Sequence, residues 1–276
     1  MQKTIIFDGK AFAAEREEEL AKKVQTLKVV PKLVSLLIGN DPASRIYTSL
    51  KKKAAKRVGI EFEVKNFGED VEVEEVVQSI KVLNRDKSVH GIMVQLPLPA
   101  NLKSKTRFVL YGIRPERDVD GLKKESPFVP AAVRAVIHIL GEAPSLGKKA
   151  IVVGSKGFFG SKLVEKLKER DLRVLGVDKE DKNLKSKVED ADIVISAAGV
   201  PNLITGDMIK PGAVIIDLGA PKGDVDRASF TSVAGQASLI TPGQASLITP
   251  VPGGVGPVTV VSLLENLVEA VVKSEE

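Results

Sequence analysis

Short apolar runs alternate with amphipathic, charged stretches along this chain, and this alternation limits the possible folds more than any other feature. The run Lys32–Ile38 has the length of a buried strand, and the charged stretch from Pro42 to about Val58 has the length of a helix. The same pairing returns at Lys149–Val153, which leads into a second charged stretch. Helical crossovers join parallel strands, so the pattern predicts an α/β fold with parallel sheets and ligands at the carboxyl ends of strands.

Composition removes several kinds of chemistry. The chain has no cysteine, which excludes disulfides, thiolate metal sites and cysteine nucleophiles. His90 and His138 lie far apart in apolar elements, so we expect no metal site. The formal charge of +5 is modest and the aromatic content is low, so we expect no nucleic-acid partner. We find neither a signal peptide nor an apolar segment long enough to span a bilayer, which predicts a cytoplasmic protein without a membrane partner.

The second predicted helix holds the first candidate site. Asn40 or Asp41 can accept the amide hydrogens of a first helical turn, and Pro42 suits the first helical position. Tyr47 and Lys51 then share one helix face. A lysine beside an aromatic ring and shielded from water can exchange protons near neutral pH. A basic surface helix with one tyrosine packed on the core explains the same spacing.

Polar residues also stand where other elements end. Gln95 lies near the end of the predicted strand His90–Leu96, at the same kind of strand end as the loop before Tyr47. Asp118 and Asp120 are separated by one valine. Such a pair can bind a metal, cap a helix or anchor a ring that offers donor groups, and a simple turn explains it as well.

The second half opens with a strand, a glycine-rich turn and a helix. Glycine lets backbone amides approach a phosphate, and the start of a helix carries partial positive charge. The spacing differs from G-x-G-x-x-G, so a plain strand-to-helix turn remains an alternative. The candidate cofactor residues in this turn are Gly154, Ser155, Lys156 and Gly160.

Two signals for the cofactor conflict. Asp178 ends the next predicted strand, where an acid binds the adenosine ribose hydroxyls of NAD. Lys156, Lys179 and Lys182 can instead meet the additional phosphate of NADP. A later strand, 191–196, leads into a small-residue turn that suits close approach of the nicotinamide ribose. The candidate residues in that turn are Ala198, Gly199 and Pro201.

This series of strands and turns predicts a Rossmann-type nucleotide-binding domain over residues 126–257. A chain of 276 residues exceeds the usual size of one hydrophobic core. We therefore predict an N-terminal parallel-sheet catalytic domain over residues 1–125 and a cleft between the two domains. A C-terminal helix over about 258–276 is expected to return to the first domain.

An identical octapeptide occurs twice in succession, at Gly235–Pro242 and Gly243–Pro250. A tandem duplication that lengthens a surface loop explains the repeat, and so does an error in the recorded sequence. A DNA read or an intact mass distinguishes the two. The copy nearer the last helix is expected to form the ordered strand.

Taken together, several separated segments resemble the bifunctional methylenetetrahydrofolate dehydrogenase/cyclohydrolase family. They are Gly39–Ser44 with Tyr47 and Lys51, Val94–Pro99, Asp118–Gly121, and Pro252–Pro257. The resemblance covers nearly the whole chain. It implies oxidation of 5,10-methylenetetrahydrofolate by hydride transfer to a nicotinamide cofactor, followed by hydrolysis of the methenyl product to 10-formyltetrahydrofolate. It also implies a homodimer through the Rossmann domains.

The family pattern carries over to single residues. It implies that Lys51 handles the proton of the cyclohydrolase step and that Gln95 hydrogen-bonds and orients this lysine. It also implies that Tyr47 stacks on the folate ring and that Asp120 pairs with the amino-pyrimidinone edge of the pterin. The residues that would line the folate cleft are Pro252, Gly253, Gly254 and Val255.

The chain departs from the family pattern in the nucleotide turn. The family commonly has Gly-Arg-Ser where this chain has Gly154-Ser155-Lys156, so the usual arginine for the NADP phosphate is absent. NADP is the expected cofactor, and NAD is possible given Asp178 and the absence of an arginine after Gly154. Two other functions compete with the family reading: a dehydrogenase of the same fold that acts on an amino or hydroxy acid, and a nucleotide-binding protein without turnover.

Overall fold

The computed structural model describes residues 4–144, 147–230 and 245–275. The chain divides into two compact units. The first consists of Ala13–Ala131 and Val260–Glu276 and is called here the three-stranded unit. The second consists of Met1–Phe12 and Ala132–Thr259 and is called the six-stranded unit.

The three-stranded unit is built on a parallel sheet with the order β3-β2-β4. Its strands are β2 (Lys32–Ile38), β3 (Glu61–Phe67) and β4 (Gly91–Val94). Its helices are α1 (Gly9–Val24), whose first residues belong to the six-stranded unit, α2 (Pro42–Arg57), α3 (Val73–Leu83) and α4 (Thr106–Tyr111), with the 3-10 turns Lys103–Lys105 and Pro115–Arg117. The two longer strands have the bounds that their apolar and alternating patterns predict.

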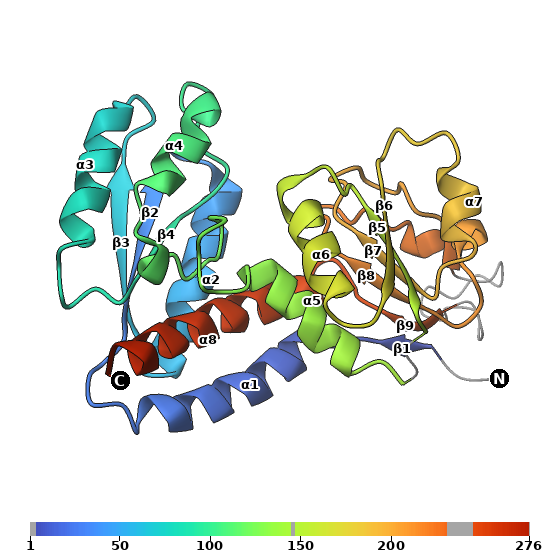
Figure 1. Ribbon diagram of the computed structural model, residues 1–276, viewed down its shortest axis with the longest axis horizontal. Helices are drawn as coiled ribbons and strands as arrows, with labels where there is room; N and C mark the ends of the chain where they lie inside the picture. The colour runs from blue at the N-terminus through green and yellow to red at the C-terminus, as the bar shows by residue number, and fades with distance from the viewer. Residues whose placement is uncertain (1–3, 145–146, 231–244, 276) are drawn as a thin grey trace. The chain divides into compact units, whose positions relative to one another are not determined.

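Both faces of this sheet are covered, which explains its continuous apolar strands. Val34 and Leu36 point to the layer formed by α3 and α4. Leu33 and Met93 point to the opposite layer, formed by α1, α2 and the last helix, α8 (Val255–Glu275). These layers are visible on the two sides of β2, β3 and β4 in Figure 1.

Helix α8 corrects two expectations. It begins at Val255 rather than near residue 258, so Val255 is helical. Its most apolar 18-residue stretch has a mean hydropathy of 1.6, so this 21-residue helix is long and apolar enough to cross a membrane, although we expected no such segment. The reason lies in packing, since 67% of its most apolar stretch is buried and residues such as Leu264 and Leu267 fill the core against the sheet.

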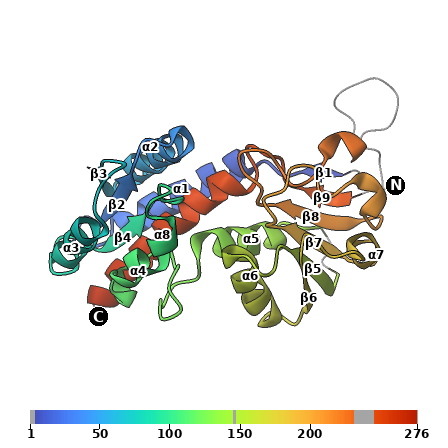
Figure 2. The same ribbon diagram turned by 90° about the horizontal axis from the view of Figure 1, so that it is seen from above.

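The six-stranded unit is a doubly wound parallel sheet with the order β1-β9-β8-β7-β5-β6. Its strands are β1 (Ile5–Ile6), β5 (Lys149–Val153), β6 (Arg173–Val177), β7 (Ile193–Ser196), β8 (Ala213–Asp217) and β9 (Ala245–Ile248). Its helices are α5 (Ala131–Gly141), α6 (Phe158–Lys168) and α7 (Leu184–Val188), with 3-10 turns at Gly206–Met208 and Arg227–Phe230. Helices α5 and α6 lie on one face of the sheet and α7 on the other (Figure 2).

The α/β class with a nucleotide-binding sheet is confirmed, and the strand order locates its ligand-binding edge. The order reverses between β5 and β7, and ligands of such sheets bind at this switch point. Both predicted cofactor turns follow these two strands. The predicted domain start at residue 1 differs from the observed grouping, because Ile5 and Ile6 pair with β9.

Strand β9 lies in the second copy of the repeated octapeptide, as expected. It pairs with both β8 and β1. The first copy, Gly235–Pro242, lies outside the described residues.

Candidate active site

The start of α2 is built as its sequence predicts. Asp41 is the N-cap, and its Oδ2 accepts a hydrogen bond of 2.7 Å from the Ser44 amide. This bond lowers the pKa of the exposed Asp41 carboxyl. Tyr47 and Lys51 follow on the same helix and are both partly buried. The capped start therefore sets which face of α2 carries Lys51.

Lys51 is held by an uncharged amide. Its Nζ donates a hydrogen bond of 2.9 Å to Oε1 of Gln95, which follows β4 and is 8% exposed. The Gln95 Nε2 donates to the Leu96 carbonyl at 2.8 Å, which fixes the side chain with its oxygen toward the lysine. Burial lowers the pKa of Lys51, and the negative charge of Asp120 partly opposes this shift. This arrangement positions a lysine without locking it as an ammonium ion.

Asp120 completes this cluster in the three-stranded unit. Burial raises the pKa of its carboxyl, and the positive charge of Lys51 acts in the opposite direction. Its backbone carbonyl accepts a hydrogen bond of 3.2 Å from the Ala131 amide. The structure thus brings Lys51, Gln95 and Asp120 together from three separate segments of the chain.

Asp118 has a different role from Asp120, although one residue separates them. It is 1% exposed, and its Oδ2 accepts the Lys123 amide at 2.8 Å. Burial raises the pKa of Asp118 to about 6. The turn interpretation of the acidic pair therefore holds for Asp118, whose carboxyl holds the loop. No cluster of three or more potential metal ligands occurs among the described residues.

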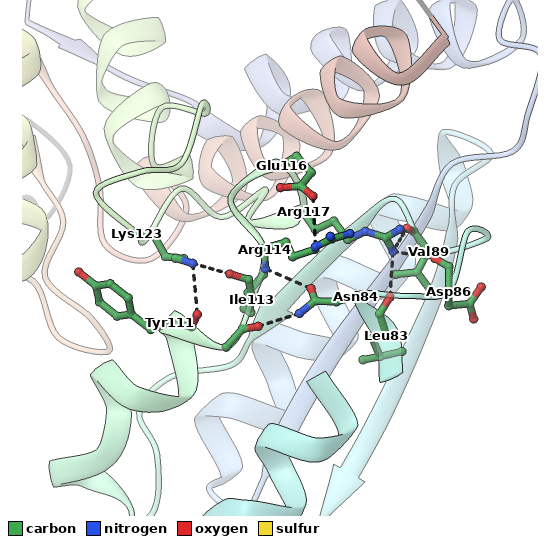
Figure 3. A network of polar contacts seen from close by, with 11 residues as sticks. Leu83, Asn84, Asp86, Val89, Tyr111, Ile113, Arg114, Glu116, Arg117 and Lys123 are labelled. Atoms are coloured by element: carbon green, nitrogen blue, oxygen red, sulfur yellow. Dashed lines mark hydrogen bonds and ion pairs between the residues drawn. The ribbon is translucent and has the colours of Figure 1, made fainter. Parts of the chain in front are cut away.

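The sequence did not predict the network of polar contacts around this loop (Figure 3). The buried Lys123 ammonium donates to the carbonyls of Tyr111 and Ile113. Asn84 donates to the Gly112 carbonyl at 2.7 Å and accepts the Arg114 amide at 3.1 Å. These side chains satisfy buried backbone groups after α4.

Two further side chains hold neighbouring segments. Arg117 donates to the carbonyls of Leu83, Asp86 and Val89, which ties the segment before Asp120 to the end of α3. Asn266 of α8, fully buried, donates to the carbonyls of Val119 and Val129 at 2.8 Å each. No sequence pattern marks these residues, because their partners are backbone groups far away along the chain.

The six-stranded unit contains the predicted phosphate turn after β5. Gly154 has a φ of +81°, and a Cβ at this position would lie 2.6 Å from the Ala197 carbonyl oxygen. A Cβ at Gly160, in the first turn of α6, would lie 2.2 Å from the Gly154 oxygen. This close packing of turn and helix leaves a backbone cradle at the start of an 11-residue helix. The residues present therefore fit a phosphate-bearing nucleotide.

Beside this turn, the acid and the lysine of the two conflicting cofactor signals pair with each other. Lys156 Nζ lies 2.7 Å from Asp178 Oδ2. The pair raises the pKa of Lys156 and lowers that of Asp178. Lys156 is largely exposed, Ser155 is partly buried, and Asp178 is 25% exposed in its side chain.

The turn after β7 carries the remaining cofactor candidates. Gly199 has a φ of +65°, Ala198 is partly buried and Pro201 is exposed. This turn and the Gly154 turn flank the switch point of the sheet. The structure thus places all predicted cofactor residues of the chain at one edge of one sheet.

The predicted folate-lining segment also belongs to the six-stranded unit. Pro252 and Gly253 precede α8, Gly253 has a φ of +105°, and the Gly254 amide donates to Pro250 at 2.8 Å. A Cβ at Gly9 would lie 1.9 Å from the Gly254 oxygen, so the segment packs tightly on the start of α1. It is grouped with the cofactor turns, whereas Lys51 and Asp120 belong to the other unit.

The fold and these two groups of residues define a two-domain α/β enzyme with a nucleotide-binding sheet. Residues 7–120 match the family described as the catalytic domain of tetrahydrofolate dehydrogenase/cyclohydrolase, and residues 127–275 match its NAD(P)-binding domain. The chain belongs to the tetrahydrofolate dehydrogenase/cyclohydrolase family.

Individual relatives cover essentially the whole chain. The bifunctional protein FolD of Francisella tularensis subsp. novicida is 38% identical over 284 aligned residues, which cover 95% of this chain and 96% of the relative. The crystal structure of the bifunctional enzyme FolD from Campylobacter jejuni is 34% identical, with a TM-score of 0.88 over 98% of this chain and 99% of that chain. The Trypanosoma brucei FolD structure, complexed with NADP and an inhibitor, is 30% identical with a TM-score of 0.89 and covers 100% of both chains.

Proposed function

We propose that this enzyme oxidises 5,10-methylenetetrahydrofolate to the 5,10-methenyl compound with NADP and hydrolyses that product to 10-formyltetrahydrofolate. Membership of the family and the near-complete cover of FolD relatives support both activities. The observation that carries the hydrolytic half is the Lys51 ammonium on the Gln95 amide oxygen, with Asp120 close enough to affect its pKa.

Lys51 acts as the proton carrier in the hydrolysis. In its neutral form it accepts a proton from the water that adds to the methenyl carbon. As an ammonium it returns this proton to N5 when the bond between that carbon and N5 breaks, and the remaining hydroxyl proton of the adduct passes to solvent as the formyl C=O forms. Gln95 keeps Nζ in place through both forms, since an amide oxygen can accept from either. The lowered pKa of Lys51 makes its neutral form more accessible than that of a lysine exposed to water.

Asp120 orients the substrate. Its carboxylate can accept two hydrogen bonds from the amino and ring N–H donors of the pterin, which are charge-assisted. The same charge raises the pKa of Lys51, so one residue both positions the ring and adjusts the lysine. Tyr47, on the same helix face, supplies an aromatic surface on which the ring can stack.

The dehydrogenase half relies on the cradle at Gly154 and Gly160 and on the turn at Ala198. When bound, the nicotinamide cofactor supplies the hydride acceptor, and the protein contributes mainly alignment. We favour NADP, because Lys156 is exposed and offers a cation to a 2′-phosphate while neutralising Asp178. NAD is the second candidate, with Asp178 on the ribose hydroxyls if Lys156 moves away.

We also propose a homodimer through the six-stranded units. Strand β6 is an edge strand, and its Leu175 side chain is 41% exposed. Phe158 and Phe159 of α6 are 45% and 37% exposed. An open apolar edge of this kind favours pairing with a second copy.

The test of the function is direct. Mixing the enzyme with methylenetetrahydrofolate and NADP should produce reduced cofactor, followed by 10-formyltetrahydrofolate with little methenyl absorbance in between. A parallel run with NAD ranks the two cofactors. Absence of reduced cofactor in both runs would rule out the dehydrogenase half, and stable methenyl absorbance would rule out the hydrolytic half.

A further inference from the structure

A buried carboxylate that was not among the candidate site residues organises the cofactor turn after β7. Asp224 is fully buried. Its Oδ2 accepts hydrogen bonds from the Ala198 amide at 2.8 Å and the Gly199 amide at 3.2 Å, and its Oδ1 accepts the Val200 amide at 2.9 Å. The hydroxyl of Ser196 donates to Oδ2 at 2.8 Å. Three consecutive amides of the turn therefore point at one carboxylate.

A second buried carboxylate holds the segment that carries the first. Asp217, at the end of β8 and 3% exposed, accepts the amides of Gly219 at 2.7 Å, Asp224 at 3.1 Å and Val225 at 3.0 Å. Burial raises the pKa of Asp217, and these amides oppose the shift. No described residue forms an ion pair with either acid. Both charges are thus met only by neutral donors within the described chain.

These hydrogen bonds determine which backbone groups of the turn after β7 remain available to a ligand. The amides of Ala198, Gly199 and Val200 are already used, so they cannot donate to a phosphate. The carbonyl oxygens of the same three residues accept no hydrogen bond from the described residues. The nearby buried negative charge also repels an anion. The turn after β7 is therefore an acceptor surface, unlike the cradle at Gly154.

We propose that Asp224 is a positioning residue that makes this turn selective for the nicotinamide half of the cofactor. That half carries hydrogen-bond donors, namely two ribose hydroxyls and the carboxamide amine, and the turn offers carbonyl oxygens to them. The inference rests on the proposed use of a nicotinamide cofactor. It adds that the two turns bind different parts of the cofactor. The Gly154 turn binds phosphate, and the turn held by Asp224 binds the hydrogen-bond donors of the nicotinamide half.

The test compares Asp224→Asn with Asp226→Asn by calorimetric titration. Asparagine keeps the size of the side chain but removes the charge and replaces one acceptor by a donor, so at least one turn amide loses its partner. We expect the Kd for NADP to rise about tenfold, in line with the loss of a charged hydrogen bond. The Kd for adenosine 2′,5′-bisphosphate, which lacks the nicotinamide half, should change less than about twofold. Asp226 lies on the same segment and accepts one amide, from Ala228, so its variant should leave both values unchanged.

Two further measurements keep the inference falsifiable. If Asp224→Asn fails to fold, Ser196→Ala removes one donor to the carboxylate and should show the same split, with a smaller change. The 3-acetylpyridine analogue of NADP lacks the amine. If Asp224→Asn raises the Kd of this analogue less than the Kd of NADP, the carboxamide amine is the donor that the turn binds. If both Kd values rise equally, the ribose hydroxyls are the donors.

Some outcomes would overturn the inference. They are an equal loss of affinity for NADP and for the bisphosphate, or no loss for either. Failure of the proposed function is a separate result, because it appears in the wild-type enzyme as absent turnover or absent NADP binding. Methenyl hydrolysis by the variant reports that the three-stranded unit is folded, and retained binding of the bisphosphate reports that the six-stranded unit is folded.

Discussion

Lys51 Nζ lies 2.9 Å from Oε1 of Gln95, although the two residues are 44 positions apart in the chain. The partner of this lysine is a neutral amide, and Asp120 acts on it only through its charge. The pair therefore holds Nζ in one place in both protonation states. Such a lysine suits repeated proton transfer better than one in a direct salt bridge.

Replacing this lysine should abolish hydrolysis selectively. Lys51→Met keeps a chain of similar length without the amine, and we expect methenyl hydrolysis to fall by about 100-fold or more, as for loss of a general base. Cofactor binding, which uses the other unit, should be unchanged. Decay of methenyl absorbance measures the hydrolysis, and calorimetry measures cofactor binding. Lys52→Met, at an exposed neighbour, is the control, and equal loss in both variants would contradict the assignment.

The pH dependence of hydrolysis should respond to the charges around Lys51. Burial lowers the pKa of Lys51 and Asp120 raises it, so the neutral lysine is gained as pH increases through this value. Asp120→Asn removes the raising charge and should move the rising limb of kcat to lower pH. Gln95→Glu adds a negative charge at the hydrogen-bond partner and should move the limb to higher pH. Shifts of the same sign in both variants would exclude Lys51 as the titrating group.

Asp118 should make the protein less stable as pH rises. Its pKa is raised from 3.8 to about 6, so the folded state binds its proton more tightly than the unfolded chain does. Its contribution to stability is complete below pH 3.8 and is lost as pH rises through about 6. The full change is on the order of 3 kcal/mol. Urea unfolding at several pH values should show this component in the wild type and not in Asp118→Asn, and parallel curves would count against it.

Substitutions of Lys156 and of Asp178 should change the preference between NADP and NAD in opposite directions. Lys156→Ala removes the cation for a 2′-phosphate and frees Asp178, so the ratio of kcat/KM for NADP to that for NAD should fall. Asp178→Ala leaves the lysine alone and should raise this ratio. Steady-state kinetics with each cofactor gives both numbers. If both variants move the ratio the same way, the pair does not select between the cofactors.

The proposed dimer depends on the edge strand β6. Leu175→Asp places a charge on this edge and should convert the dimer to a monomer in sedimentation velocity runs. Val272→Asp on α8 changes a side chain of the same exposure, 41%, in the other unit, and should leave the dimer intact. A wild-type protein that sediments as a monomer would refute the proposal at once.

Local patterns were sufficient for most of the elements. The apolar run Lys32–Ile38 and the alternating run Glu61–Phe67 have the bounds of β2 and β3, because a buried strand needs little beyond its own side chains. Asp41 caps α2 as predicted, since a cap is a contact within one turn. The sequence did not predict the two-residue strand β1, because its partner β9 lies at the other end of the chain.

The sequence by itself determined the α/β class, the glycine turns and the residue types of the candidate site. These follow from contacts between near neighbours, and the similarity to a family placed Lys51, Gln95 and Asp120 in one site. Only the tertiary structure decided which acid does what: Asp118 holds a loop while Asp120 faces Lys51, and Asp224 takes up the amides of a cofactor turn. The physical reason is that burial and backbone partners set the role of a carboxylate, and both arise from segments far apart in the chain.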